Sequence, residues 1–339
     1  MNKDLILYLH SASVFQLLHA GVELKLFESL NKNGTLPFFK ISNSLKLKEQ
    51  PTRCLLFGLK ALGLINESNN EYRNSNSISE LFNNNEFGLF KKMVLIQAHI
   101  MYLGQTDFVE SLKQNTNAGL SRYSGTGKTI YEKLEHNPKL KKIFYDYMEA
   151  YSDYAIPFLF KSVDFSKDNF VLDVGGGEGN NTIAIAKQNP HLTVTLLELP
   201  VAKSIAYKKI KQNNLTKQIK FFTGDMFKDD FPKNQDSILF IHQLVIWSPE
   251  QNKSMLKKAF DSLNENGRVI IFSSVAEDTE DKPLMAALDT VYFRAIAAGN
   301  GMIYPWKDYE KLLHDVGFKK VEKIKCNTWT PHGIIIGYK

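Results

Sequence analysis

Cysteine is scarce in this chain, and long apolar segments are absent from it. Among 339 residues there are two cysteines, Cys54 and Cys326, which lie far apart and outside any metal-binding spacing. This argues against a disulfide framework or a cysteine-based zinc site and favours a reducing compartment. No apolar run approaches the ~18 residues of a membrane span, and the N-terminus lacks a signal peptide's continuous apolar stretch. We therefore expect a cytoplasmic protein with no membrane contact.

A strong excess of one charge is also missing. The net charge of +6 is spread along the chain without a long basic block, which is poor support for nucleic-acid binding. Hydrophobic residues make up 43% of the chain, enough for a sizeable core, and the length favours two domains. We place an N-terminal domain at residues 1–163 and a C-terminal domain at residues 164–339.

The N-terminal part has the apolar spacing of helices. This spacing predicts one helix over residues 5–31 and another over residues 49–62, where Gly63 is a good stop. The next segment, "LINESNNEYRNS", predicts a small hairpin, so the region has the pattern of a winged helix. Winged helices often bind DNA, but the second helix offers only Arg53 and Lys60 as cations. A DNA-binding regulator that senses a ligand is therefore the weaker alternative, and we expect no nucleic-acid partner.

From about residue 167 onward, strand-like and helix-like segments alternate. Examples are the strand "NFVLDV", the helix "NNTIAIAKQNP", the strand "TVTLLEL" and the final strand "GIIIGYK". Such alternation predicts an α/β domain with a parallel, doubly wound, Rossmann-like sheet. Ligands in this fold bind at the carboxyl ends of the strands, near the point where the strand order reverses.

The stretch "VLDVGGGEGNN" predicts a cofactor site, because glycines let the backbone turn tightly and approach a ligand. Glu198 ends the next strand, where a carboxylate can bind both ribose hydroxyls. In "GDMF" of the third strand, Asp225 can accept the adenine amino group and Met226 can pack on the ring. Asp173 would repel a phosphate and suits an ammonium. This favours S-adenosylmethionine over a dinucleotide.

The motifs "LDVGGGEG", "LELP", "GDMF", "SILFIHQLVIWSPEQ" and "LNENGRVII" occur in that order. Together they resemble those of the S-adenosylmethionine-dependent small-molecule O-methyltransferases, which include caffeate, acetylserotonin and bacterial natural-product enzymes. The resemblance covers nearly the whole chain and implies a homodimer formed through the N-terminal domain, with S-adenosylhomocysteine as product. The cofactor residues that we expect are Asp173, Gly175, Gly177, Glu198, Asp225, Met226 and Phe227.

The resemblance also exposes a missing general base. The family has a Leu-His-Asp-Trp-type motif after "GDMF", and alignment from Trp247 places Val245 at the histidine and Ile246 at the aspartate. A base typically contributes ~10²–10⁴-fold when a neutral hydroxyl must lose its proton. Its loss favours a substrate that needs little deprotonation, or a changed reaction.

His242 is the candidate replacement, as a base or as the ligand of a metal that orients a keto acid, although a histidine satisfied by a backbone carbonyl would look the same. Arg294 can hold a substrate carboxylate or lie on a helix surface. No metal site is assigned. The substrate-binding candidates are Tyr147, Gln243, Trp247, Tyr292, Asn300 and Tyr304.

The leading hypothesis is O-methylation of a small aromatic or carboxylate-bearing secondary metabolite without the usual histidine base. The alternatives are C- or N-methylation, assisted by a metal on a keto acid in one version, and a non-methylating reaction of a cofactor-binding relative.

Overall fold

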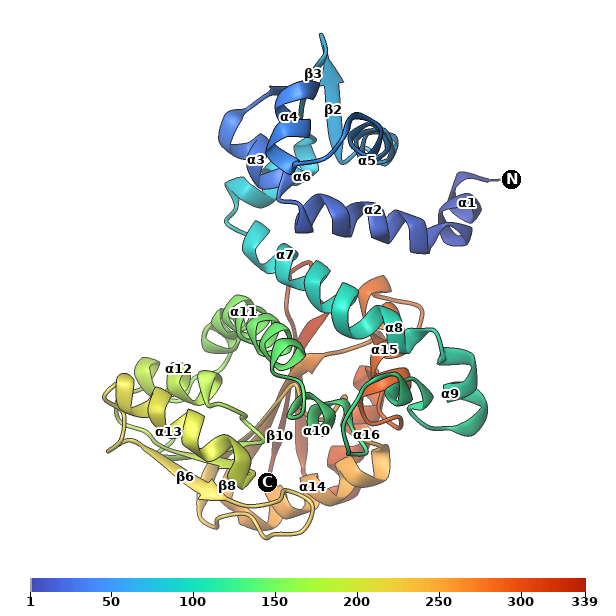
Figure 1. Ribbon diagram of the computed structural model, residues 1–339. Coiled ribbons are helices and arrows are strands. Elements are labelled where there is room, and N and C mark those ends of the chain that lie inside the picture. The colour runs from blue at the N-terminus through green and yellow to red at the C-terminus, as the bar shows by residue number, and fades with distance from the viewer. Residues whose placement is uncertain (1) are drawn as a thin grey trace. The chain divides into compact units, whose positions relative to one another are not determined.

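The computed structural model describes residues 2–339 (Figure 1). The chain divides into two compact units that interleave in sequence. The first holds the residues up to Tyr102 together with Lys139–Ala150, and the second holds Leu103–Pro138 and Tyr151–Lys339. The segments 103–138 and 151–163 thus pack with the C-terminal unit, although the sequence analysis grouped them with the N-terminal domain. The functional boundary after residue 163 stays a prediction.

The first unit is a helical winged-helix domain. Its helices are α1 (Lys3–Leu9), α2 (Ser11–Glu23), α3 (Leu26–Asn33), α4 (Phe38–Leu45), α5 (Glu49–Ala61), α6 (Asn76–Asn83), α7 (Phe87–Ile96) and the π-helix η1 (Gln97–Met101). The predicted hairpin is present as β2 (Ile65–Ser68) and β3 (Glu71–Asn74), and β3 also pairs with β1 (Leu36–Pro37).

The single helix expected over residues 5–31 is wrong, because the segment forms three helices. The backbone leaves the helical conformation at His10, and Lys25 adopts a left-handed conformation with φ of 58° between α2 and α3. Among residues 2–339, no single helix is long and apolar enough to cross a membrane. Only α1 and α2 together satisfy those criteria, and they are bent by 74° relative to each other.

The second unit is built on a seven-stranded sheet with the order β6-β5-β4-β7-β8-β10-β9. The strands are β4 (Phe170–Val174), β5 (Thr193–Glu198), β6 (Ile219–Thr223), β7 (Gln235–Ile241), β8 (Leu263–Ser274), β9 (Lys320–Lys325) and β10 (His332–Tyr338). The first five run parallel, as predicted, whereas β10 is antiparallel to both β8 and β9. The sequence analysis missed β9 and this reversal. They follow from the short connection between β9 and β10, which forces antiparallel pairing.

Helices cover both faces of this sheet (Figure 1). One face packs on α14 (Pro249–Ser262) and α16 (Trp306–Val316), and the other packs on α12 (Asn180–Gln188), α13 (Lys203–Gln212) and the second half of α11 (Pro138–Ser162). Alternate residues of each central strand serve opposite faces. In β7, Ile238 and Phe240 join the first core, and Leu239 and Ile241 join the second.

The second unit has further helices between these elements. They are α8 (Tyr102–Gln105), α9 (Phe108–Gln114), η2 (Ala118–Arg122), α10 (Ile130–Leu134), η3 (Pro200–Ala202), α15 (Leu284–Tyr292) and the π-helix η4 (Phe293–Ala297). Strand order reverses between β4 and β7, since β5 and β6 extend the sheet on one side and β8 on the other. The carboxyl ends of β4 and β7 are therefore the place where this fold binds ligands.

Candidate active site

The glycine turn after β4 has the conformation that glycine alone adopts easily. Gly175 and Gly177 have φ of 69° and 58°, in the left-handed region. A Cβ on Gly177 would meet no heavy atom within 4 Å, so the turn faces open space there. The backbone can therefore approach a ligand closely at Gly177. This geometry fits the predicted contact with S-adenosylmethionine.

Asp173 lies beneath this turn and is only 1% exposed. Its Oδ2 accepts a hydrogen bond of 2.6 Å from the Thr182 hydroxyl. Among the residues that the structure describes, its buried Oδ1 has no hydrogen-bond partner. Burial raises the pKa of Asp173 to about 6. A cationic group bound near the turn would relieve this desolvation, as expected for a carboxylate next to the ammonium or sulfonium of the donor.

Glu198 ends β5 and is fixed by two backbone groups. Its Oε2 accepts from the Gly177 amide at 2.9 Å, and its Oε1 accepts from the Leu199 amide at 2.7 Å. Burial raises the pKa of this carboxyl, and the two amides act against that rise. Each oxygen keeps a further lone pair, so the carboxylate can accept from ribose hydroxyls without reorganising.

The "GDMF" loop is held in place by its own polar contacts. Asp225 accepts from the Phe227 amide at 2.9 Å and pairs with Lys228. Lys258 of α14 donates to the carbonyls of Met226 and Phe227 at 3.2 and 2.8 Å. Phe227 in turn meets Trp247 edge to face, with ring centroids 4.7 Å apart. The loop is thus held in place, which suits the predicted contact of Asp225 and Met226 with an adenine ring, and the sequence analysis missed the contribution of Lys258.

Gln243 connects the segment after β7 to the glycine turn after β4, at the place where the strand order reverses. Its amide Nε2 donates to the Gly175 carbonyl at 2.7 Å, and a Cβ at Gly175 would lie 2.6 Å from that nitrogen. The residue after His242 is therefore tied to the glycine turn. Gln243 supports the turn that the cofactor would contact, and its predicted substrate-binding role stays a prediction.

His242 is the first residue beyond β7 and has an unusual backbone. Its φ is 55°, a conformation that costs energy for a residue with a Cβ and that concentrates at functional sites. Within residues 2–339, its buried Nε2 has no hydrogen-bond partner. Burial lowers the pKa of His242 to about 4. The imidazole is therefore neutral at pH 7 and keeps an unused position on Nε2. A histidine satisfied at Nε2 by a backbone carbonyl is not what the structure contains.

Two ring side chains that the sequence analysis did not identify lie next to His242. His332 of β10 lies 5.1 Å from His242 between ring centroids, and Tyr151 of α11 lies 5.6 Å away. The Tyr151 hydroxyl is 3.5 Å from the Ser274 hydroxyl. Burial lowers the pKa of His332 and raises that of Tyr151, and Asp289 of α15 contributes to the rise at Tyr151. We name the set His242, His332, Tyr151, Ser274 and Asp289 the polar cluster.

Asp289 adds a carboxyl group to this cluster. It is half-buried on α15, and burial raises its pKa to about 6. A half-buried carboxyl with a raised pKa is a candidate partner for a substrate cation. Periodicity could not identify Asp289, because an acidic residue within an exposed-looking helix gives no signal of its burial.

Val245 and Ile246 lie where the family alignment predicts the base and its acid. Both are buried, 3% and 8% exposed, in an apolar cluster with Ala286 and Ile303. Trp247 packs at the edge of this cluster. Neither Val245 nor Ile246 has a side-chain atom that can accept a proton. The alignment itself stays a prediction.

The remaining candidates have structural partners. Arg294 in η4 donates from Nη1 to Asn115 Oδ1 at 2.7 Å and to the Gly299 carbonyl at 2.5 Å. The Asn300 amide donates to Gln251 at 3.0 Å. The hydroxyl of Tyr304 donates to the Trp247 carbonyl at 2.6 Å. Arg294 Nη1 thus braces a loop, and the predicted roles of these residues stay predictions.

Tyr292 and Tyr147 complete the list. Tyr292 is buried, 6% exposed, at the end of α15. Tyr147 is half-buried and belongs to the first unit. Their predicted contacts with a substrate stay predictions.

The sequence matches the model of the O-methyltransferase domain over residues 106–319. It is also 41% identical to the L-tyrosine C(3)-methyltransferase of Streptomyces lavendulae, over 98% of this chain and 91% of that protein. The chain belongs to the O-methyltransferase family. It is an S-adenosylmethionine-dependent methyltransferase, as the glycine turn and Glu198 predicted.

Two further comparisons place this methyltransferase within the family. It is 27% identical to the 3-hydroxy-5-methyl-1-naphthoate 3-O-methyltransferase of Streptomyces sahachiroi, over 96% of this chain and 91% of that protein. The crystal structure of the apo S-adenosylmethionine-dependent methyltransferase SibL is 37% identical and has a TM-score of 0.88, with 99% of each chain covered.

A more distant solved structure confirms the fold. Human N-acetylserotonin methyltransferase in complex with S-adenosylmethionine has a TM-score of 0.83 at 18% identity, covering 100% of this chain and 98% of the human one. At this identity the likeness supports the arrangement of elements, which agrees with the predicted fold class.

Proposed function

We propose that this methyltransferase acts on a ring carbon next to a phenolic hydroxyl, in a tyrosine-like amino acid. The observation that carries the proposal is the 41% identity, over 98% of the chain, to a protein described as an L-tyrosine C(3)-methyltransferase. Aromatic C-methylation replaces the O-methylation that the sequence analysis favoured. A relative that is described as a 3-O-methyltransferase is 27% identical.

The polar cluster supports this chemistry. When bound, S-adenosylmethionine supplies an activated methyl group that needs no acid to be transferred. Removing the phenolic proton makes the adjacent ring carbon nucleophilic, and a base that does so is worth ~10²–10⁴-fold. His242 is neutral at pH 7, and its buried Nε2 has no partner among the described residues, so Nε2 offers a position for that proton. The burial that keeps this imidazole neutral also lowers its basicity, so the free position at Nε2, and not the pKa, supports the role.

The proton balance is complete without a further reagent. The phenol would give its proton to His242, and the ring carbon would bond to the methyl group as the sulfur–methyl bond of the donor breaks, which leaves S-adenosylhomocysteine. The ring hydrogen on that carbon would then leave as a proton and restore the aromatic ring as a phenolate. His242 would return its proton to the phenolate oxygen, so one proton is released in total. His332, whose burial also keeps it neutral, lies 5.1 Å from His242 between ring centroids and holds it in place by ring packing.

Asp289 accounts for an amino-acid substrate. Its carboxyl would pair with the substrate ammonium, which removes the cost of burying a lone negative charge. Asp173, Gly175, Gly177, Glu198, Asp225, Met226 and Phe227 would hold the methyl donor. Gln243 would keep the glycine turn in register with His242.

The test is methyl transfer from S-adenosylmethionine with a deuterated methyl group to L-tyrosine, followed by mass spectrometry and NMR. We expect one CD3 group in place of a ring hydrogen next to the phenol. Transfer to the phenolic oxygen would overturn the C-methylation proposal and restore O-methylation. Transfer to the amino nitrogen would overturn both. Tyramine lacks the carboxylate of tyrosine, and 4-hydroxyphenylpropionate lacks its ammonium. Methylation of each compound therefore shows which of the two groups the enzyme requires.

We also propose that the enzyme is a cytoplasmic homodimer joined through the first unit. Five consecutive apolar residues of α1, from Leu5 to Leu9, are each at least 36% exposed, and such patches commonly mark interfaces. The two free cysteines support a reducing compartment.

A further inference from the structure

A group of metal-ligating side chains lies in the first unit, in a part of the chain that the methyl-transfer chemistry does not use. His19 and Glu23 are four residues apart near the end of α2, so they lie on the same face of that helix. His99 lies in the π-helix η1, about 80 residues later in the sequence. One ligand atom from each of the three side chains can be chosen so that all lie within 4.8 Å of one another.

The orientation of the two histidines fits coordination by one ion. Their rings are 5.5 Å apart between centroids and nearly perpendicular, at 89°. His19 Nε2 is buried, and no described residue offers it a hydrogen bond. A buried polar atom without a partner is costly, and a cation would satisfy it. This orphaned nitrogen is evidence for a ligand that is independent of the spacing of the three side chains.

Neighbouring rings keep His19 in this orientation. Phe15 stacks on His19 with an interplanar angle of 5°, and Tyr102 stacks on Phe15 with ring centroids 5.7 Å apart. His99 offers a ring nitrogen from η1 within the same group of ligand atoms. The π-helix gives η1 an extra residue in its turn, and such turns occur frequently at functional sites.

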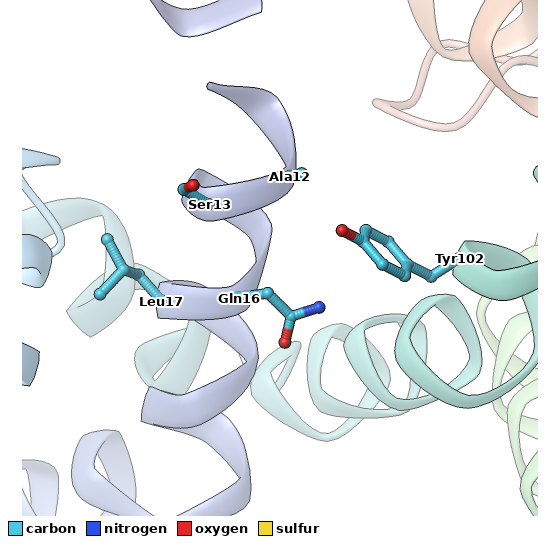
Figure 2. Close-up of a pocket in the computed structure, with 5 residues that line it drawn as sticks. All are labelled: Ala12, Ser13, Gln16, Leu17 and Tyr102. Carbon is cyan, nitrogen blue, oxygen red and sulfur yellow. The ribbon is translucent and has the colours of Figure 1, made fainter. Parts of the chain in front are cut away.

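A groove lies between α2 and Tyr102, whose ring stacks on Phe15. It has a volume of about 360 Å³ and is lined by Ala12, Ser13, Gln16 and Leu17 of α2 and by Tyr102 (Figure 2). Figure 2 shows the Tyr102 hydroxyl pointing toward α2 and the Gln16 amide extending from α2. Gln16 is three residues before His19, on the same side of the helix. Glu23, the carboxylate of the proposed site, is itself exposed, so an ion can reach the three side chains from solvent.

We propose that His19, Glu23 and His99 form a binding site for a divalent transition-metal cation, with Zn²⁺ as the preferred ion. Two imidazoles and one carboxylate are the ligand types that Zn²⁺ takes in proteins. Hard cations such as Mg²⁺ and Ca²⁺ prefer oxygen ligands and fit this set poorly. The fourth position would hold water, so the ion joins α2 to η1 and stabilises the first unit.

The charges set an upper limit on the affinity. Glu23 brings one negative charge. Lys139 begins the segment Lys139–Ala150 of the same unit, and its positive charge acts on His99 in the opposite sense to that of Glu23. With three protein ligands and one opposing cation, we expect weaker binding than in a four-ligand structural zinc site. The site lies within one compact unit, so its geometry does not depend on the second unit.

The test uses the full chain without an affinity tag, freed of metal by chelator dialysis. Equilibrium dialysis should show one Zn²⁺ per chain, and Co²⁺ should give the visible absorption of a four-coordinate site. We expect both signals to be lost in His19→Ala and in His99→Gln, and Glu23→Gln should weaken Zn²⁺ binding about tenfold or more. Zn²⁺ should also raise the Tm of the wild type, but not that of the His19 and His99 variants.

The controls separate this site from other histidines. His10→Ala, at an exposed position in the same unit, and His242→Ala, in the polar cluster, should both retain the Zn²⁺ stoichiometry. Cooperative thermal unfolding and an unchanged far-ultraviolet circular dichroism spectrum of the His19 and His99 variants verify that the first unit is folded. Equal Zn²⁺ stoichiometry in wild type and in a folded His19→Ala/His99→Gln double variant would overturn the proposal. Loss in His242→Ala alone would assign the metal to the polar cluster instead. Neither result bears on the methyl-transfer proposal, which is tested separately by the assay with deuterated donor.

Discussion

The imidazoles of His242 and His332 lie edge to face, with ring centroids 5.1 Å apart and an interplanar angle of 69°. His242 directly follows β7 and His332 begins β10, and β8 lies between these two strands. His332 is buried and His242 is half-buried, and burial lowers the pKa of each. Within residues 2–339, neither Nε2 has a hydrogen-bond partner. A pair of neutral imidazoles with unused nitrogens is therefore present at the edge of the sheet where the fold binds ligands.

Replacing His242 by glutamine should slow methyl transfer. If His242 accepts the phenolic proton, kcat should fall by ~10²–10⁴-fold while KM for the phenol changes little. Steady-state kinetics with deuterated donor and mass-spectrometric product detection measure both constants. His136→Gln is the matched control, because His136 is exposed and is not a member of the polar cluster. A His242→Gln enzyme with unchanged kcat would remove the histidine from the mechanism.

The same residue should make stability depend on pH in a defined direction. His242 has a pKa of about 4 in the folded chain, below the ordinary value of 6.5. The unfolded chain then binds more protons between these values, so the free energy of unfolding rises with pH through this window and levels off above about pH 6.5. The full contribution is at most about 3 kcal/mol.

Denaturant titrations of wild type and His242→Gln between pH 4 and pH 7.5 measure this contribution. Asp173 and Asp289, whose pKa values are raised to about 6, act in the opposite direction in both proteins. The difference between the two proteins therefore isolates His242. It should favour the variant increasingly as the pH falls below 6.5. A difference that is independent of pH would mean that His242 titrates normally.

The cofactor side of the site was predictable from sequence because its signals are local. A few neighbouring residues are enough to recognise Gly175 and Gly177 as a turn and Glu198 as the end of the next strand. In the folded chain, Glu198 Oε2 lies 2.9 Å from the Gly177 amide nitrogen. Strand periodicity and the alternation of elements likewise predicted the parallel part of the sheet.

The polar cluster was not predictable, because its members meet only through sheet order. His332 reaches His242 because β10 inserts antiparallel beside β8, with His332 opposite Ser274. No local pattern in "HGIIIGYK" encodes that insertion. The break of the first helix at Lys25 was missed for a different reason. A left-handed lysine is uncommon, and neither glycine nor proline marks the position.

Glu198→Gln should weaken binding of the methyl donor. The neutral amide loses charge-assisted acceptance from the ribose and can hold only one of the two backbone amides through its oxygen. We expect the Kd for S-adenosylhomocysteine to rise about 10–100-fold. Isothermal titration calorimetry measures it, with Glu265→Gln, an exposed position of the same unit, as control. Equal affinities would place the ribose elsewhere.

The proposed dimer can be tested on α1. Leu5 and Leu9 are 56% and 70% exposed, and arginines there would desolvate two charges in an apolar interface. Leu5→Arg/Leu9→Arg should shift the protein from dimer to monomer in sedimentation-velocity experiments. Phe57→Arg, at another apolar position of the first unit that is 72% exposed, should leave the dimer intact. A double variant that stays dimeric would exclude α1 from the interface.

Val245→His places a histidine at the position where the family alignment expects the general base, and tests whether O-methylation is then restored. Val245 is 3% exposed and packs with Ile246, Ala286 and Ile303, so an imidazole there must be desolvated and must displace apolar neighbours. We expect the free energy of unfolding to fall by about 1–3 kcal/mol, measured by urea titration. Val201→His, 59% exposed, should change stability much less. Because Ile246 occupies the position where the family alignment places the aspartate, that residue cannot orient the new imidazole, and the variant should still methylate carbon if His242 is the base. A gain of phenolic O-methylation would instead show that the position, and not the residue at 242, decides which atom receives the methyl group.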